Sequence, residues 1–368
     1  MRKIFYNFAF LCILSSVKAQ IPNGYYDSAT GTGYTLKTQL YNIIKNHTTN
    51  SYGNLWNLYK NYPSAFNDNW YDASDTNKIL DIYSENPSGP DAYTYTPGTN
   101  QCTGNNANQE GLCYNREHII PQSVFNENSP MVSDPFHIWP TDYRVNGERA
   151  NLPYGVVQNA TFTSTNGSKK GNNLNSGYSA GFSGTVFEPI DEFKGDIARA
   201  YFYFATRYQE NGIQNWNYEM FNGTKDKVFK DTFLKILVTW HTNDPVSPRE
   251  IALNNAIYSY QNNRNPFIDH PEYVAQIWGN VLGTDDFNFQ ERKDIELVKK
   301  NNTTYTVILK NKETQIEEIR IYNTNGQLIN TIDNRMHKNN IDLEFSKKGV
   351  YIIKVLGKKL EINKKVII

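Results

Sequence analysis

The chain has 368 residues, of which 39% are hydrophobic, 14% aromatic and 20% charged. Its mean hydropathy of -0.64 is low, but 26 Tyr, 19 Phe and 6 Trp provide enough large side chains to bury a core. This composition excludes collagen-like, coiled-coil and multi-span membrane proteins, and the length fits two domains of ordinary size.

Charge is unevenly distributed, although 37 basic and 37 acidic residues give a net charge of zero. Residues 20–290 contain 18 basic and 27 acidic residues, a net charge of -9, whereas residues 291–368 contain 16 and 10, a net charge of +6. If the larger region bound nucleic acid, it would need a local basic patch or a bound cation, because its overall charge repels phosphate.

Residues 1–19 have the pattern of a secretory signal peptide. Arg2 and Lys3 precede an apolar run that ends at Leu14, and a Val-Lys-Ala cleavage site precedes Gln20. The apolar run is too short to favour a stable membrane anchor, and no other stretch is apolar enough to cross a membrane. We expect the mature protein to begin at Gln20 and to be exported without stable membrane insertion.

The signal peptide contains Cys12, so the exported protein would keep Cys102 and Cys113. In an oxidising compartment these two are expected to form a disulfide, which would stabilise the fold by about 3 kcal/mol through closure of a short loop. A zinc site completed by His118 and His137 is the alternative. Ten residues separate the cysteines, however, and this does not match the usual spacing of zinc ligands.

The first predicted elements are helices. Thr35 is the expected N-cap of a helix that runs to residue 44, and a second helix is expected over residues 55–62. The apolar face of the first helix consists of Leu36, Leu40, Ile43 and Ile44. Residues 78–84 (KILDIYS) have the β-branched and aromatic character of a strand, and the ENPSGPD sequence after them predicts a turn.

A polar stretch rich in Gly, Asn and Ser covers residues 158–184, and helical patterns return after it. Apolar residues at helical spacing predict helices over residues 191–209, 226–241, 249–261 and 269–278. Asp269 or His270 is the expected N-cap of the last helix. Three arginines in this region are expected to pair with carboxylates or to fix loops: Arg199, Arg207 and Arg264.

The last part of the chain differs in kind. Short segments of alternating or β-branched residues are separated by Gly, Asn and Lys turns, which predicts an all-β domain, consistent with a small sandwich. The expected organisation is therefore a larger domain of residues 20–288, a linker of residues 289–294 and a β-domain of residues 295–368.

Groups that can carry out hydrolysis are concentrated in residues 113–125 and 133–155. Two of the six histidines, His118 and His137, lie there with carboxylates, Asn146 and three arginines. Each residue taken alone has an ordinary structural explanation. Together they predict a metal-assisted hydrolytic site, because phosphodiester hydrolysis needs a base for water, a cation at the phosphate and a way to hold the leaving oxygen.

An imidazole, with its ordinary pKa near ~6.5, suits the base. Mg2+ prefers oxygen ligands and keeps several waters, which Glu117 and the amide oxygen of Asn146 fit. Adjacent strand residues face opposite sides, so the strand must bend or end near His118 if both serve one centre. Arg149 would share a helical face with Asn146, which would place a guanidinium next to the phosphate.

The sequence NREHIIPQS, followed by DPFHIWPTD and VNGERANLPYG, closely resembles the secreted and periplasmic endonuclease I family, whose core is a ββα-metal (His-Me) finger. DIYSENPSG, GDIARAYFYFATRY and NRNPFIDHPE resemble its companion segments, so the resemblance covers residues 35–280. It implies an α+β fold in which helices surround the finger. It also implies a sugar-nonspecific endonuclease acting on DNA and often RNA. We expect the protein to be a monomer that uses Mg2+, or alternatively Mn2+ or Ca2+.

By the same resemblance, His118 corresponds to the general base, and Glu117 and Asn146 to the metal ligands. Some members of the family have a long Cys-rich insertion that includes an arginine acting at the phosphate, whereas here only 27 residues separate the Glu-His pair from the asparagine. Arg149 is therefore the expected phosphate arginine, and Arg116 is the second candidate. His137 is the alternative base, although a supporting or core position suits it better.

The segments IRIYNTNGQLI and GVYIIKVL, with the terminal Lys-Lys-Val-Ile-Ile, resemble the type A sorting domain of the type IX secretion system. This implies a targeting module read by that machinery and a secreted or outer-membrane-surface location. A substrate-binding β-sandwich is the alternative for the tail. For the whole chain, the alternative is a surface adhesin or glycan-binding protein without catalysis, which would leave the Glu-His pair and the N-x-x-R sequence unexplained together.

Overall fold

The computed structural model describes residues 21–72, 75–102, 108–279 and 295–367, the last range with short gaps at 302, 310–314, 324–327, 335–337, 347–349 and 358–359. The predicted signal peptide, residues 1–19, and the predicted linker, residues 289–294, lie outside the described residues. The chain forms two compact units, residues 1–283 and 284–368. Each unit is described by itself.

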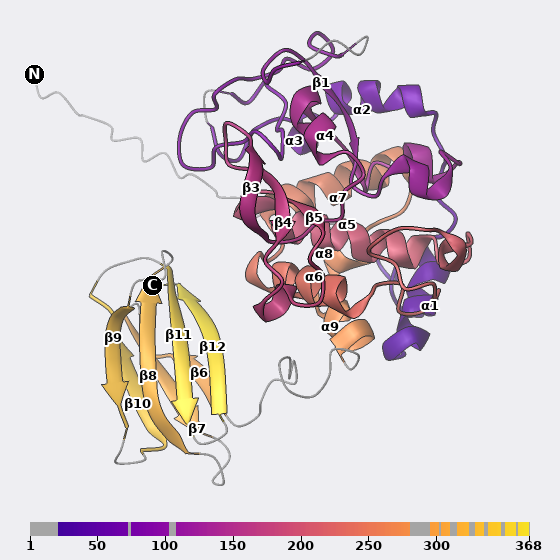
Figure 1. Ribbon diagram of the computed structural model, residues 1–368. Coiled ribbons are helices and arrows are strands. Elements are labelled where there is room, and N and C mark those ends of the chain that lie inside the picture. The colour runs from indigo at the N-terminus through magenta and orange to yellow at the C-terminus, as the bar shows by residue number, and fades with distance from the viewer. Residues whose placement is uncertain are drawn as a thin grey trace, which may run out of the picture. The chain divides into compact units, whose positions relative to one another are not determined.

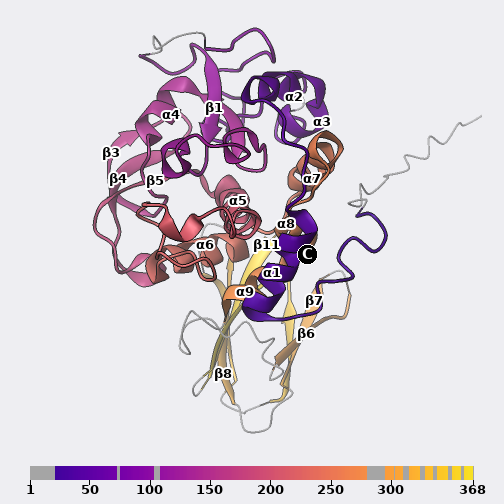
Figure 2. The same cartoon turned by 90° about the vertical axis from the view of Figure 1, so that its right-hand side faces the viewer.

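The first unit is built around one buried helix, α5 (Lys194–Arg207), in which every residue from Gly195 onward is buried. Because this helix is enclosed on all sides, its neighbours must cover its whole circumference. Helices α1, α6 and α8 pack against it (Figure 1), and α1 lies beside α9 (Figure 2). The remaining helices are α1 (Gly33–Ile44), α2 (Leu55–Asn61), α3 (Pro63–Phe66), α4 (Tyr143–Arg149), α6 (Asp231–Asn243), α7 (Pro248–Gln261), α8 (Pro266–Asp269) and α9 (Glu272–Trp278).

The predicted helices form, but several begin elsewhere than expected. α1 begins at Gly33 after Thr32, so the prediction of Thr35 as its N-cap is wrong. α6 begins at Asp231 because Val228 adopts a φ of 66°, which a helix does not allow. α7 is well capped: the Ser247 hydroxyl accepts a hydrogen bond from the Glu250 amide, and the Glu250 carboxylate accepts one from the Ser247 amide.

Asp269 closes α8 and His270 follows it, so neither residue is the N-cap of α9, which is Pro271. Two of the arginines form the expected pairs with carboxylates. Arg199 forms a buried ion pair with Glu250, and Arg264 Nε lies 2.6 Å from Asp269 Oδ2.

Residues 78–84 do not form the predicted strand. Ile79 makes only an isolated bridge with Asn67, and the chain then turns, because the Asp81 carboxylate accepts hydrogen bonds from the Tyr83 amide at 2.9 Å and from the Ser84 hydroxyl at 2.6 Å. Such local side-chain bonds compete with a strand's ladder. The consecutive buried residues that suggest a strand instead fill the core around a turn.

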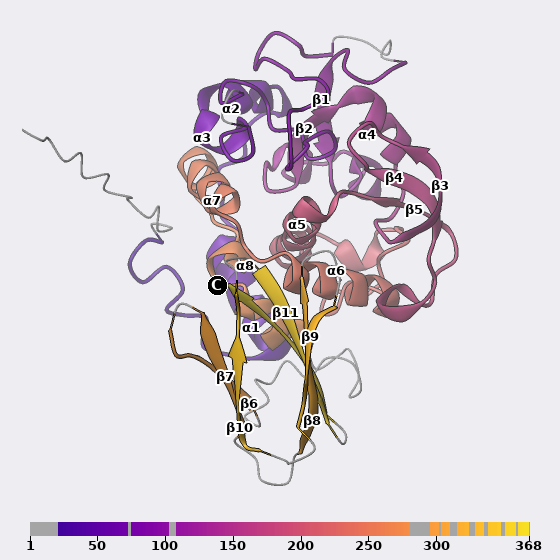
Figure 3. The same cartoon turned by 90° about the vertical axis from the view of Figure 1, so that its left-hand side faces the viewer.

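A three-stranded antiparallel sheet occupies the polar stretch that follows α4. It consists of β3 (Val157–Thr163), β4 (Lys169–Asn173) and β5 (Thr185–Glu188), in the order β3-β4-β5. The sheet lies on the side of the unit near α4 (Figure 3), where Lys170 pairs with Glu148 of that helix. β3 is largely exposed and rich in polar residues, so its sequence carries little apolar alternation.

The second unit is all-β, as predicted. One sheet has the order β10-β7-β6 and the other β12-β11-β8-β9, all antiparallel. Buried residues of both sheets, among them Val307, Leu343, Ile319 and Ile353, form one hydrophobic cluster, which is the core of a sandwich. The strands are β6 (Ile295–Lys299), β7 (Thr304–Leu309), β8 (Ile316–Asn323), β9 (Leu328–Asp333), β10 (Asn340–Glu344), β11 (Val350–Gly357) and β12 (Leu360–Ile367).

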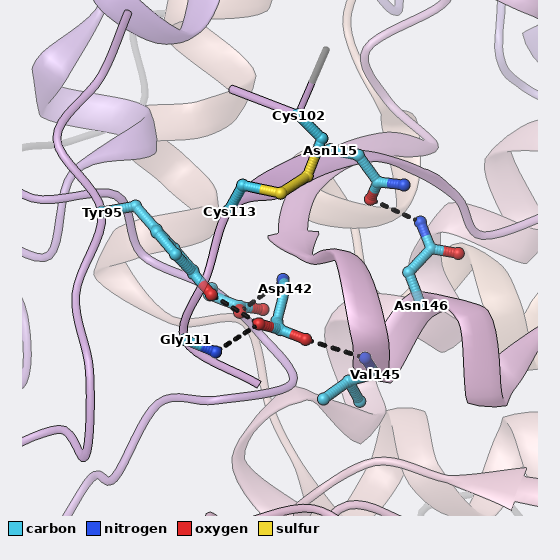
Figure 4. Close-up of a disulfide and its surroundings, with 9 residues drawn as sticks. Tyr95, Cys102, Gly111, Cys113, Asn115, Asp142, Val145 and Asn146 are labelled. Atoms are coloured by element: carbon cyan, nitrogen blue, oxygen red, sulfur yellow. Dashed lines mark hydrogen bonds between the residues drawn. A yellow bond between two sulfur atoms is a disulfide. The ribbon is translucent and has the colours of Figure 1, made fainter. Parts of the chain in front are cut away.

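The predicted disulfide is confirmed: Cys102 and Cys113 are bonded (Figure 4). Both sulfurs are therefore used, and the alternative zinc site is wrong. The bond lies at the entry to β1 (Tyr114–His118), where the Cys102 amide donates to the Tyr114 carbonyl at 2.9 Å.

Among the described residues, no helix has the length and apolar character needed to cross a membrane.

Candidate active site

The predicted site lies on a ββα unit. β1 (Tyr114–His118) pairs antiparallel with β2 (Ile138–Asp142), in a register that runs without interruption from Tyr114 opposite Asp142 to His118 opposite Ile138. α4 begins at Tyr143, the residue that follows the end of β2. The strand ends at His118 without a bulge, so the change of direction expected there comes from strand termination.

Asp142 is the junction between strand and helix. Its carboxylate caps α4 by accepting a hydrogen bond from the Val145 amide at 2.8 Å, and it also accepts bonds from the Tyr95 hydroxyl and the Gly111 amide (Figure 4). Its own amide donates to the Asp81 carboxylate at 2.7 Å. These bonds fix the orientation of α4 relative to the two strands.

A cavity of about 350 Å³ opens at the end of this unit, where β1 meets α4. It brings together all five residues predicted to act in catalysis or metal binding: Arg116, Glu117, His118, Asn146 and Arg149. Its remaining lining consists of Tyr52, Asn115, Pro121, Gln122, Tyr143, Gly147, Ala150 and Asn151.

Glu117 is 2% exposed and is held through one of its two oxygens. The Tyr83 hydroxyl donates to Oε1 at 2.9 Å, the Tyr154 hydroxyl lies at 3.5 Å from it, and Arg149 Nη1 lies at 3.1 Å. All partners among the described residues are on Oε1, which leaves Oε2 for another ligand. Burial raises the pKa of Glu117 to about 7, while the Arg149 guanidinium opposes that rise.

Asn146 is oriented by Asn115, the residue that begins the NREH motif. The Asn146 amide nitrogen donates to Asn115 Oδ1 at 2.8 Å. Figure 4 shows the consequence: the amide oxygen of Asn146 points away from Asn115. That oxygen is the atom of this side chain that can act as a hard ligand.

The two histidines of the window have different environments. His118 is 6% exposed and lines the cavity, with Nε2 at 3.3 Å from the Val132 carbonyl oxygen. His137 is fully buried, is absent from the cavity lining, and has Nε2 at 2.8 Å from the Met131 carbonyl oxygen. Its ring packs edge-on against Phe204. His137 thus occupies a core position behind His118, at 5.9 Å between ring centroids.

Burial lowers the pKa of His118 to about 3, and the neighbouring His137 adds to this effect. Burial also lowers the pKa of His137 to about 4, against the opposing charge of Asp134. Both rings are therefore neutral at pH 7. A neutral imidazole carries one hydrogen and one free lone pair. Because a carbonyl can only accept, the contact with Val132 places the hydrogen of His118 on Nε2 and the lone pair on Nδ1.

Arg149 is 1% exposed, and its guanidinium is used inside the protein. Nη1 donates to the carbonyl of His118 at 2.8 Å and to that of Ala150 at 3.2 Å, and Nη2 donates to the carbonyl of Ile119. The guanidinium also lies over the Tyr154 ring at 4.7 Å. Arg149 therefore holds the chain where β1 ends, in addition to pairing with Glu117.

Arg116 has a more open position. Its guanidinium lies 3.5 Å from the centroid of the Tyr52 ring and 4.4 Å from that of Trp56, and Nη1 donates to the Tyr52 carbonyl at 2.9 Å. It is half-buried, and no ion pair found among the described residues includes it. The two rings hold a cation at the rim of the cavity without neutralising it.

Comparison with known proteins decides what this arrangement is. The sequence profile of the endonuclease I family matches residues 32–272, more than half of the chain. The chain belongs to the endonuclease I family. It is therefore a nuclease with a nucleic-acid substrate, and the non-catalytic adhesin is not needed to explain its export. Members of the family typically depend on a divalent metal.

Two relatives support the assignment. The chain is 32% identical over 262 residues to the extracellular ribonuclease of Bacillus subtilis strain 168, an alignment that covers 69% of this chain and 78% of the relative. It is also 32% identical over 261 residues to the extracellular ribonuclease of Bacillus amyloliquefaciens, with the same coverage. The endonuclease I match ends at residue 272, before the C-terminal unit begins.

That unit has a family of its own. Residues 277–368 match the secretion system C-terminal sorting domain, as the resemblance to type IX sorting domains implies. The sorting domain and the extracellular relatives indicate a secreted or cell-surface endonuclease I protein.

Sequence reasoning missed the residues that support the site: Tyr83, Asn115, Tyr154, Tyr52 and Trp56. The signals were present, because Tyr83 lies in the DIYSENPSG segment, Asn115 begins NREH, and Tyr154 lies in LPYG. Each of these segments marks the family resemblance without revealing which partner its side chain meets.

Proposed function

We propose that this protein is a metal-dependent endonuclease that hydrolyses phosphodiester bonds of DNA and RNA without recognising the sugar, and that it acts as a monomer. The observation that carries the proposal is the convergence of His118, Glu117 and Asn146 on one cavity. A base and two hard oxygen ligands next to each other are what hydrolysis of a phosphodiester requires.

His118 is the general base. Its Nδ1 accepts a proton from the attacking water, while the hydrogen bond from Nε2 to the Val132 carbonyl keeps the ring in the required tautomer. Because burial keeps the ring neutral at pH 7, a nitrogen lone pair is available to accept the proton. His137 is unsuited to this role because it is fully buried and lies outside the cavity.

Glu117, through Oε2, and Asn146, through Oδ1, would hold the metal ion. The residues fit a hard cation: Glu117 and Asn146, which offer a carboxylate and an amide oxygen, both line a cavity that has room for waters, and Mg2+ commonly takes few protein ligands and keeps several waters. Mg2+ is the proposed ion, with Mn2+ and Ca2+ as alternatives. A bound divalent cation would stabilise the negative charge that develops on the phosphate and the leaving oxygen.

We assign the two arginines in the reverse of the order expected from the sequence. Arg116 binds the phosphate, which is supported by its place at the cavity rim and by the absence of a carboxylate partner among the described residues. Arg149 positions Glu117 and the carbonyl groups at the end of β1. Arg116 and the metal ion together provide the local positive charge that the acidic catalytic region otherwise lacks.

The two Bacillus relatives are named ribonucleases, which supports RNA as a substrate, and the resemblance to sugar-nonspecific enzymes supports DNA. The direct test is incubation of the purified protein with plasmid DNA and with RNA, with and without EDTA. Both substrates should be cut only when the divalent ion is present. Cleavage that persists in EDTA would contradict the metal requirement.

The matched pair His118→Asn and His137→Asn tests the base. His118→Asn should lower the cleavage rate by about 100-fold or more, which is the usual effect of losing a general base. Its circular dichroism spectrum should be unchanged. His137→Asn should retain the rate when assayed well below its melting temperature. The opposite result would assign the base to His137.

A further inference from the structure

A second group of oxygen ligands lies outside the active-site cavity. Asp68, Asp72, Glu85 and Asp91, here called the acidic cluster, each place one carboxylate oxygen within 4.8 Å of the others. The four residues come from two loops between α3 and β1, with the sequences DNWYD and ENPSGPD. Two separate segments of the chain therefore place groups of the same charge next to each other.

Three of the four carboxylates are oriented by main-chain amides. Asp68 accepts hydrogen bonds from the amides of Tyr71 and Asp72, both at 3.1 Å. Asp72 accepts one from the Asp91 amide at 3.2 Å, and Asp91 accepts one from the Asn86 amide at 2.7 Å. The loops thus fold around these carboxylates and hold them towards a common centre.

Glu85 differs from the other three. It is 0% exposed, and neither of its oxygens has a hydrogen-bond partner among the described residues. A fully buried carboxylate without a donor is costly, because it loses its hydration and gains nothing in return. One of its oxygens nevertheless lies within 4.8 Å of an oxygen of each of the other three, so a single cation would be a partner that all four can share.

No lysine, arginine or histidine that the structure describes forms an ion pair with the acidic cluster. The charge of the four carboxylates is therefore uncompensated by side chains. Burial, followed by repulsion from Asp91 and Asp68, raises the pKa of Glu85 to about 9, and burial raises that of Asp91 to about 6. Without a cation, the buried Glu85 would be protonated at neutral pH.

We propose that Asp68, Asp72, Glu85 and Asp91 form a structural Ca2+ site, separate from the catalytic metal site of Glu117 and Asn146. Ca2+ takes six to eight oxygen ligands at ~2.3–2.6 Å, so opposite oxygens in its shell lie about 4.6–5.2 Å apart. The spread of 4.8 Å among the four oxygens fits that shell. Opposite oxygens around Mg2+ lie only about 4.0–4.2 Å apart, and Mg2+ seldom takes four carboxylates.

This site bears on the active centre through the chain. Glu85 lies two residues after Tyr83, whose hydroxyl donates to the catalytic-site carboxylate of Glu117 at 2.9 Å. Both residues follow Asp81, whose carboxylate accepts a hydrogen bond from the Tyr83 amide. The same carboxylate accepts one from the amide of Asp142, the residue that caps α4. Ca2+ at the acidic cluster would therefore hold the turn that presents Tyr83.

The test uses the mature full-length protein, stripped of metal with EDTA and then freed of the chelator. We expect 1 mM Ca2+ to raise its melting temperature by about 5 °C or more. The same rise is expected in Asn146→Ala, which lacks a catalytic metal ligand, and in Asp75→Asn, which removes a carboxylate from the same loop but outside the cluster.

The Glu85→Gln/Asp91→Asn double variant should not respond to Ca2+. Without Ca2+ it should melt at the same temperature as the wild type or higher. The two amides relieve the repulsion between the carboxylates of the acidic cluster, and their side chains have nearly the same shape as those they replace. A wild-type protein indifferent to Ca2+, or a double variant that responds as the wild type does, would overturn the proposal. An equal response of Asn146→Ala, which lacks a catalytic metal ligand, to 1 mM Mg2+ would overturn the assignment of Ca2+.

A second measurement does not depend on how the double variant folds. Trp70 and Tyr71 lie between Asp68 and Asp72 in the chain, so Tb3+ bound at the cluster should emit when these aromatic residues are excited. Ca2+ should displace the Tb3+ and so reduce that emission, in the wild type and in Asn146→Ala alike. Emission that is lost in Asn146→Ala would place the ion at the catalytic site and refute the second site.

Discussion

Arg149 Nη1 lies 3.1 Å from Glu117 Oε1, and the two side chains are only 1% and 2% exposed. An ion pair so thoroughly buried depends on both partners, because the loss of one leaves the other charged and without water. The pair joins the proposed metal ligand to the helix that carries Asn146. Arg149 thus belongs to the framework of the site even though it lines the cavity.

The two arginines should respond differently to the same substitution. Arg149→Met should lower the free energy of unfolding by about 3 to 5 kcal/mol, because Glu117 would remain buried without its cation. Arg116→Met should lower the free energy of unfolding by about 1 kcal/mol or less, since it removes only stacking on Tyr52 and Trp56. It should, however, lower kcat/KM by about 10-fold or more, because the contact with the phosphate is lost. Urea unfolding and steady-state kinetics on both variants measure these effects. Normal stability of Arg149→Met would show that its ion pair has no structural role.

The metal ligands are tested by rescue. Glu117→Ala and Asn146→Ala should both weaken metal-supported cleavage, and raising Mg2+ should partly restore at least one of them, because each variant loses a ligand and keeps the base. Asn151→Ala, which lines the same cavity without a proposed ligand role, is the control and should need no extra Mg2+. Isothermal titration that finds unchanged Mg2+ affinity in both ligand variants would contradict the roles given to them.

His137 should make the protein less stable in acid. Its pKa is lowered from 6.5 to about 4 in the folded protein, so between these values the unfolded chain binds a proton that the folded chain excludes. The free energy of unfolding therefore falls as the pH decreases from 6.5 towards 4, by at most about 1.4 kcal/mol per pH unit from this residue. His137→Asn removes the group, so its stability should decline less steeply over that interval. Urea unfolding at several pH values compares the two slopes, and parallel slopes would disprove the effect.

The C-terminal unit should be dispensable for catalysis. All the proposed catalytic residues lie in residues 116–149, and the tail is a separate compact unit, within which residues 291–368 have a net charge of +6. Residues 20–288 alone should cut plasmid DNA as fast as residues 20–368 at about 150 mM salt, where the charge of the tail is largely screened. In the native host, deletion of residues 295–368 should prevent secretion. Loss of activity in a folded truncated protein would instead make the tail a substrate-binding domain.

The sequence by itself determined the features that depend on neighbouring residues. Amphipathic spacing revealed the central helix α5, and β-branched segments between turns revealed the all-β tail. The Glu-His pair and Asn146 could be placed at one site because two short strands and the start of a helix span so little chain. The disulfide followed from there being only two cysteines in the exported chain.

Only the tertiary structure decided which groups from distant segments meet. Arg116 and Arg149 are equivalent cations in a sequence, and burial alone separates the one stacked on Tyr52 from the one paired with Glu117. The predicted strand at residues 78–84 failed because the Asp81 carboxylate binds its own turn. The acidic cluster joins residues of two loops and depends on the burial of Glu85. Solvent exclusion and the partner across space determine what such a charged group does, and neither is encoded within a short stretch of residues.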